Sequence, residues 1–162
     1  MIREQEDVII QTVCRIFIPF MQIYSLYVLA HGHGSPGGGF QGGCIFAASF
    51  ILMAIVFDLN EVKRRFAEKI VILFFSLGVF IFAGMGLLCL LLGGNFLDYG
   101  VLSTILPVDP VMARYYGIAA IETGVQITVM AIMVSIFLDL LTGGLHEKAV
   151  EEEYDRYNTQ QV

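Results

Sequence analysis

One acidic residue, Glu122, lies well inside an apolar stretch and is the first candidate for chemistry in this sequence. It occurs in Ile118-Ala-Ala-Ile-Glu-Thr-Gly-Val-Gln126, which holds no other charged residue. A carboxyl group in such surroundings is costly unless it pairs, takes up a proton or faces water, so it is a candidate for stabilising a cation. Gln126 follows four residues later on the same helical face. The structural alternative is a protonated Glu122 that hydrogen-bonds to a neighbouring helix.

A glycine-rich segment is the second candidate. His31-Gly-His-Gly-Ser-Pro-Gly-Gly-Gly-Phe-Gln-Gly-Gly43 holds seven glycines and one proline between two apolar runs. Missing side chains expose backbone amides and carbonyls to an ion, a lipid headgroup or a neighbouring helix. His31 and His33 are candidates for proton exchange. No nearby Cys or acidic residue completes a metal shell around them, so no bound metal or other cofactor is expected.

The arrangements that support enzymes are missing from the sequence. Gly32-His-Gly-Ser-Pro-Gly37 formally matches a dinucleotide-binding pattern. That pattern needs a preceding strand, whereas an apolar run of membrane length precedes this one. No nucleophile, base and orienting acid occur together either. The chain is therefore not expected to be an enzyme by itself.

The elements that must position these residues are membrane helices. The 162-residue chain is 57% hydrophobic and has a mean hydropathy of +0.75, well above that of soluble domains. Apolar runs at about 8–30, 40–57, 70–92 and 117–141 are mostly long enough to cross a bilayer, for which about 20 helical residues suffice. We expect an all-α integral membrane fold, with four helices in one compact bundle and the glycine-rich connection between the first two. The second run becomes a full span only if it begins inside the glycine segment.

The distribution of basic residues predicts the orientation. With four spans, both termini and the second connection share one side of the membrane. Only Arg114 lies on the other side. Seven of the nine basic residues lie on the side of the termini: Arg3, Lys63, Arg64, Arg65, Lys69, Lys148 and Arg156. The positive-inside rule makes the termini cytoplasmic. The net charge of −6 comes largely from the chain ends, and residues 142–162 are expected to form an acidic, solvated cytoplasmic tail.

This orientation places Glu122 and the glycine segment in the same half of the membrane. At 1.5 Å per residue, Glu122 lies about 8 Å from the outer end of the last predicted span. The two features could therefore meet in one outer-half cavity. Residues 93–116 form an outer loop in which prolines prevent a continuous helix, and we expect it to lie against the membrane or a neighbouring subunit.

Polar residues of the first span form one stripe. They are separated by four, four, three and three residues: Gln11, Arg15, Pro19, Gln22 and Ser25. This spacing puts them on one helical face, which is not expected to face lipid. Arg15 lies about 10 Å from the cytoplasmic end, so it either extends to the headgroups or pairs with a buried carboxylate. An Arg15–Glu122 contact is not expected, because the two enter from opposite faces.

Small residues in the spans indicate close helix packing. Gly43 and Ala47 have small-xxx-small spacing. In the third span, Gly78, Gly84 and Gly86 reduce the side-chain bulk, so that another helix can approach closely. Three cysteines are interpreted as packing residues without metal-ligand spacing: Cys14, Cys44 and Cys89. So many small and polar positions indicate helix neighbours beyond the four spans of this chain.

The glycine segment also carries a family resemblance. Between a first and a second membrane span, it resembles the signature of the B subunit of Mrp/Mnh-type multisubunit sodium/proton antiporters. The specific positions are Pro36, Gly37, Gly38, Gly39 and Phe40. The family includes homologous subunits of membrane-bound hydrogenases and related respiratory complexes, and Gln41 is more similar to those relatives. The resemblance covers nearly the whole chain.

The resemblance implies a small subunit that contributes to the Na+ path of a membrane complex, with the other subunits as partners and without nucleic acid. It also implies the cell membrane of a bacterium or archaeon. Glu122 is then the residue expected to stabilise the cation, Gln126 its polar neighbour, and 36–40 the backbone that shapes the opening. Two alternatives remain open: a scaffold that packs larger transport subunits without contacting the ion, and an independent small channel or carrier.

Overall fold

The computed structural model contains four long helices and one short 3₁₀ helix, and it describes residues 4–32, 37–57 and 68–159. The long helices are α1 (Glu4–Ala30), α2 (Gly39–Val56), α4 (Glu68–Leu91) and α5 (Pro110–Thr159), and the 3₁₀ helix η1 spans Tyr99–Thr104. All four long helices contain segments of sufficient length and apolarity to cross a membrane. The all-α prediction with four spans is confirmed.

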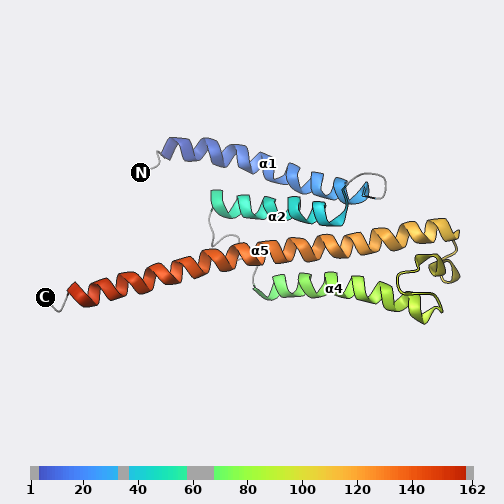
Figure 1. Cartoon of the computed structure of the whole chain (residues 1–162). Coiled ribbons are helices and arrows are strands. Elements are labelled where there is room, and N and C mark those ends of the chain that lie inside the picture. Colours follow the sequence, from blue (N-terminus) through green and yellow to red (C-terminus); the bar gives the residue numbers. More distant parts are fainter. Residues whose placement is uncertain (1–3, 33–36, 58–67, 160–162) are drawn as a thin grey trace.

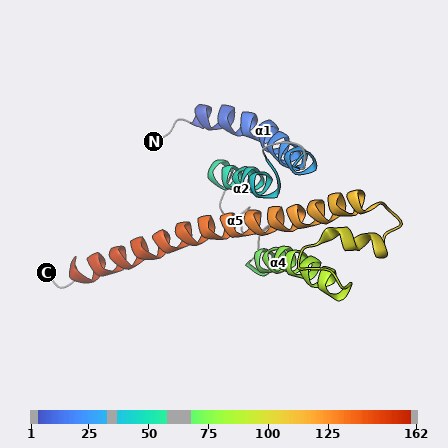
Figure 2. The ribbon, with the colours of Figure 1, turned by 45° about the vertical axis from the view of Figure 1, so that its right-hand side comes forward.

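The helices lie in an open row in the order α1, α2, α5, α4 (Figures 1 and 2). The prediction of a compact bundle is therefore wrong. The last helix of the sequence lies in the middle of the row and separates α2 from α4, which are consecutive in the sequence. The helices run side by side, and the start of α1 and the end of α5 lie at the same end of the helix axes, as four crossings require (Figure 1). We call this end the terminal end, and the opposite end, where α2 begins, the glycine end.

The helical segments of membrane length begin and end close to the first three predicted apolar runs, whereas the fourth segment begins before the predicted run. The membrane-length segments are Val8–Ala30, Gly39–Val56, Lys69–Leu91 and Pro110–Leu141. Proline suits the first position of a helix, where its fixed φ fits and its missing N–H is not needed. The amide of Ala113 donates to the carbonyl of Asp109 (2.9 Å), which closes the first turn. Glu122 therefore lies about 18 Å along α5 from Pro110 rather than 8 Å.

The connection between α4 and α5 folds against its own chain. Gly93 adopts a left-handed φ of 82° just after α4, a conformation that commonly ends helices. The Asp98 carboxylate accepts a hydrogen bond from the Gly100 amide (3.3 Å) at the start of η1. Tyr99 packs on Gly117 of α5, where a Cβ would lie 2.5 Å from the ring. The loop therefore packs on α5, and its contact with the membrane or a neighbouring subunit stays a prediction. The predicted break before α5 is confirmed.

Beyond the membrane-length segment, α5 continues without a break to Thr159. The segment 142–159, expected to be a solvated tail, is an extension of the last span. Figure 1 shows it projecting past the ends of the other helices.

The interface between α4 and α5 depends on two glycines. A Cβ on Gly124 would lie 2.9 Å from the carbonyl oxygen of Gly78, and a Cβ on Gly78 would lie 3.0 Å from the amide nitrogen of Thr128. Gly86 packs against Phe96, whereas no atom lies within 4 Å of a Cβ on Gly84. Two of the three glycines singled out in this span are therefore packing positions within the chain.

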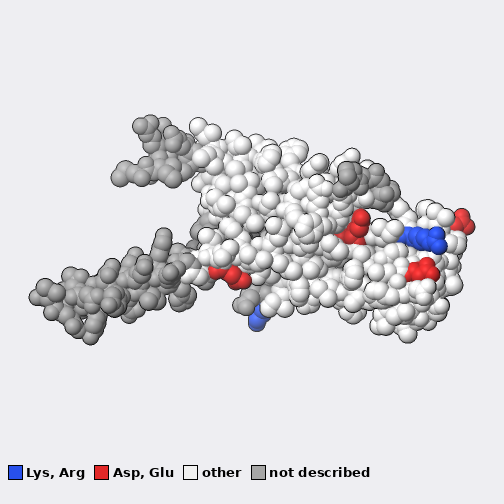
Figure 3. All heavy atoms as spheres, in the orientation of Figure 1, with Lys and Arg blue, Asp and Glu red and all other residues white. Residues whose placement is uncertain are grey.

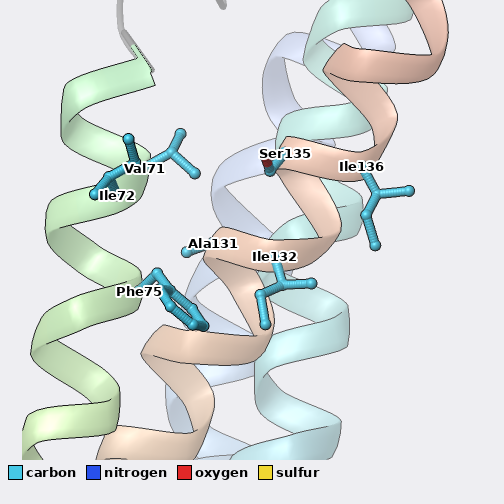
Figure 4. Close-up of a pocket in the computed structure, with 7 residues that line it drawn as sticks. All are labelled: Val71, Ile72, Phe75, Ala131, Ile132, Ser135 and Ile136. Atoms are coloured by element: carbon cyan, nitrogen blue, oxygen red, sulfur yellow. The ribbon is translucent and has the colours of Figure 1, made fainter.

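Near the terminal end, α4 and α5 leave an apolar groove of about 330 Å³ between them. Figure 4 shows Phe75 of α4 pointing toward α5 in this groove. The remaining lining residues are Val71, Ile72, Ala131, Ile132, Ser135 and Ile136.

The sides of the row are mostly apolar and open. In the most apolar stretch of α1, only 17% of the residues are buried, and the same fraction is buried in α4. The face in Figure 3 is almost wholly uncharged over the described residues, with charged atoms in small separate patches. Such a surface requires lipid or other membrane helices around it.

Candidate functional site

The start of α2 lies directly against Glu122 of α5. Gly39 is buried there, and a Cβ at this position would overlap the carbonyl group of Glu122 and lie 2.9 Å from its Cα. Only glycine allows two helix backbones to approach so closely. The glycine segment and Glu122 therefore meet at one level of the molecule, although 83 positions separate Gly39 from Glu122 in the sequence.

The carboxyl group of Glu122 lies in a cradle left by missing side chains. A Cβ on Gly38 would lie 2.7 Å from Oε1, and a Cβ on Gly32 would lie 3.1 Å from Cδ. Glu122 is half-buried. Within the described residues, no group donates a hydrogen bond to its carboxylate and no basic side chain pairs with it.

The start of α2 lies beside this carboxyl group. Gly38 is the N-cap residue of α2, and no side chain caps that helix start. The first amides of a helix carry a partial positive charge, equivalent to roughly half an elementary charge. The carboxyl group of Glu122 therefore lies beside the partially positive start of α2.

Gln126, one turn further along α5, joins three helices. Its side chain is 5% exposed, and Nε2 donates to Oγ of Ser25 (2.8 Å) and, at 3.4 Å, to the Ser25 carbonyl. The Ser25 hydroxyl donates to the carbonyl of Gly42 (2.7 Å). We call this contact of α1, α2 and α5 the polar interface. Its bonds hold α2 against the Glu122 side of α5.

The predicted polar stripe of α1 faces α2 along part of its length. Nε2 of Gln22 donates to Oγ of Ser49 (3.3 Å), which itself donates to the Phe46 carbonyl (2.6 Å). Gln11 is half-buried near the terminal end. Arg15 is exposed, and its guanidinium lies 5.7 Å from the centre of the Phe57 ring. Arg15 and Glu122 are not in contact, as expected.

The remaining candidates lie around the glycine end. Nδ1 of His31 lies 3.0 Å from the Tyr27 carbonyl oxygen, and the two rings are 4.1 Å apart. Gln41 is exposed and covers Gly37, where a Cβ would lie 3.0 Å from its Cδ. The exposed Phe40 points away from the core. His33 and Pro36 lie outside the described residues.

Sequence reasoning missed two contributors to the polar interface. Gly42 accepts the Ser25 hydrogen bond, and Ser49 is fully buried against Gln22. Their spacing of seven residues was an available signal, because it places both on the face of α2 that also contains Gly39 and Met53. In the described ranges, no three His, Cys, Asp or Glu residues gather closely enough to hold a metal ion.

Four helices of membrane length define a multi-pass membrane protein. Residues 9–135 match the family described as "Domain related to MnhB subunit of Na+/H+ antiporter". A relative from Staphylococcus haemolyticus strain JCSC1435 is 33% identical over 144 residues, which cover 87% of this chain and 98% of the relative. Another, from Staphylococcus aureus strain Newman, is 29% identical over 140 residues, which cover 86% and 98%. Both are named "Putative antiporter subunit mnhB2".

The chain therefore belongs to the MnhB family. The matched region runs from α1 through the membrane part of α5 and includes every residue of the Glu122 cradle and of the polar interface. The resemblance seen in the glycine segment is confirmed.

Proposed function

We propose that this chain is a non-catalytic membrane subunit of a multisubunit Mrp-type cation/proton antiporter, and that Glu122 forms part of its Na+ path. Family membership supports the first statement. The second depends on one observation: a half-buried carboxyl group lies in a glycine cradle, without a donor among the described residues. A purely structural carboxyl group would be expected to have such a donor.

The physical role of Glu122 in this proposal is to offset the cost of removing water from a monovalent cation. Gly32 and Gly38 make room for the carboxylate itself, because a Cβ at either position would overlap it. The amide of Gln126 is used in bonds to α1. Its part is therefore to fix the helices around the carboxylate, so that the cradle keeps its shape during ion passage. His31, exposed at the same end, is the proposed group for proton exchange at the opening.

The proposal also covers the location of the chain and its partner proteins. The chain would lie in the cell membrane of a bacterium or archaeon with both termini in the cytoplasm, and its apolar sides would contact the other antiporter subunits. The relatives reported above are named as antiporter subunits. A hydrogenase-like redox module beside this chain is supported only by Gln41. Identification of the proteins that copurify with the chain tests both statements.

The test of the ion path is Glu122→Gln in the complete complex. We expect Na+-dependent proton antiport to fall by about tenfold or more, because a charge near the cation is worth several kcal/mol even at an intermediate dielectric. Asp139→Asn is the matched control. Asp139 also lies on α5, but it is exposed near the terminal end, where it accepts a hydrogen bond from Ser135 (3.5 Å). Antiport in everted vesicles and the amount of assembled complex are measured for both variants.

Wild-type antiport in the Glu122→Gln variant would refute the ion-path role. Loss of the complex from the membrane would instead favour the scaffold alternative. That alternative is supported by the polar interface, which could serve assembly alone. A Glu122→Asp variant separates the two further, because a shortened carboxylate changes the ion dependence of transport only if the ion contacts it.

A further inference from the structure

A second polar feature lies far from Glu122, between α1 and α2 toward the terminal end. A groove of about 450 Å³ opens there. Arg15 and Gln22 of α1 provide its polar wall, and Phe50, Met53 and Phe57 of α2 provide its apolar wall. A charged guanidinium beside an aromatic and aliphatic wall is an amphipathic lining.

Arg15 enters this groove without an anionic partner. Its guanidinium lies 5.7 Å from the centre of the Phe57 ring, and no carboxylate among the described residues pairs with it. Within α1, Pro19 has no N–H and cannot donate to the Arg15 carbonyl four residues earlier. Within the described residues, the groove therefore presents a guanidinium without an anionic partner.

The guanidinium lies near the end of α2, where we expect the membrane surface. Arg15 follows Val8, where the membrane-length segment begins, by about 10 Å along α1. Phe57 is the C-cap residue of α2, so the guanidinium reaches the level at which α2 ends. An arginine side chain extends its charge toward the headgroups in this way while its stem stays in the apolar layer.

The chemistry of the groove selects an anionic ligand with an apolar tail. A guanidinium donates two parallel hydrogen bonds to a phosphodiester. The wall of the groove formed by Phe50 and Met53 is apolar and suits a hydrocarbon chain. A carboxylate side chain from a partner helix would satisfy the charge but would fill only a fraction of 450 Å³. Lys69, which is exposed where the membrane-length part of α4 begins, adds a basic residue at this end of the helices. Basic residues near the end of a span attract anionic lipids.

We propose that the groove between α1 and α2 binds one anionic glycerophospholipid, with its phosphate on Arg15 and an acyl chain along Phe50 and Met53. This site is separate from the Glu122 cradle and does not depend on the proposed ion path.

The test uses photo-crosslinking in the complete complex, reconstituted in nanodiscs of phosphatidylcholine with one-fifth phosphatidylglycerol. A benzoylphenylalanine replaces Phe50 in the groove or, as the matched control, Phe80, which is 74% exposed on α4. Mass spectrometry identifies the adducts. We expect the ratio of phosphatidylglycerol to phosphatidylcholine adducts at position 50 to be about fivefold above their ratio in the bilayer, as one basic residue near the surface provides. At position 80, adducts should follow the bilayer composition.

Variants assign the enrichment to Arg15. Arg15→Gln should abolish it, Arg15→Lys should retain part of it, and Lys69→Gln should leave it within twofold of the wild type. Adducts at position 50 in bilayer proportion would overturn the proposal, as would enrichment that survives Arg15→Gln. A peptide of another subunit as the main adduct would also overturn it and would assign Arg15 to a partner carboxylate.

Discussion

The two interfaces of α5 are built from different chemistry. On one side, the polar interface joins α5 to α1 and α2 through hydrogen bonds of Gln126 and Ser25. On the other side, α4 packs through the close approach of Gly78 and Gly124. The Thr128 hydroxyl on that side donates to the Gly124 carbonyl of its own helix. Within lipid, apolar contact alone discriminates poorly between neighbours, whereas a hydrogen bond specifies its partner. The ionisable group lies on the side that is specified by hydrogen bonds.

The sharpest way to break this contrast is Gly39→Ala. A Cβ at this position would overlap the backbone of Glu122, which cannot rotate away. We expect a loss of about 3 kcal/mol in the free energy of unfolding, at the upper end of overpacking costs. Denaturant titration of the full chain in bicelles measures it. Gly84→Ala is the control, because no atom lies within 4 Å of its added Cβ, and it should stabilise α4 by about 0.5–1 kcal/mol.

The corresponding change on the apolar side is Gly78→Ala. Its Cβ would press on the backbone of Gly124, but Thr128 Oγ1 can rotate away, so a smaller loss of about 2 kcal/mol is expected. The helix displaced is α4, whereas the Glu122 cradle stays intact. Residual complex should therefore still carry out antiport with normal Na+ dependence. An altered Na+ dependence in this variant would show that the two sides are coupled.

A double-mutant cycle on Ser25 and Gln126 measures the polar interface directly. Each replacement by alanine removes the 2.8 Å bond between Nε2 and Oγ. We expect a coupling energy of about 0.6–1.5 kcal/mol, the range found for hydrogen bonds between membrane helices. A coupling near zero would mean that the two side chains fill space without specifying the partner helix.

The smallest effect is expected for Thr128→Val. Oγ1 of Thr128 donates to the carbonyl of Gly124 in its own helix (2.9 Å), and valine has nearly the same shape. The stability change should stay within about 0.5 kcal/mol, because this bond returns to its own helix and links no partner. The same titration measures it, and a loss comparable to that from Ser25→Ala would contradict the contrast between the two interfaces.

Much of the architecture was predictable because it follows from length and polarity. Runs of about 20 apolar residues have few alternatives in a membrane, and three of the four spans match closely. The meeting of Glu122 with the glycine segment followed from counting crossings and depth. Proline misled the prediction at Pro110, because the same residue that interrupts a helix also starts one well.

The order of the helices was not predictable from the sequence. Both α2 and α4 present apolar residues on every side, so periodicity does not identify the face that meets a partner. The insertion of α5 between them is determined by local fit: Gly39 against Glu122 on one side and Gly78 against Gly124 on the other. The sequence placed the glycine segment and Glu122 in one half of the membrane, but the close backbone contact of Gly39 with Glu122, like that of Gly78 with Gly124, is seen only in the folded structure.

The unbroken length of α5 has a mechanical consequence. From Pro110 to Thr159 it spans 50 residues, or about 75 Å, against a hydrocarbon layer of about 30 Å. Glu122 lies in the membrane-length part of α5, and the helix continues beyond that part at the terminal end. A tilt of about 5° at Glu122 would displace Thr159 by roughly 5 Å at 1.5 Å of rise per residue. A small rearrangement around the carboxylate would therefore be amplified into a displacement large enough to be sensed outside the bilayer.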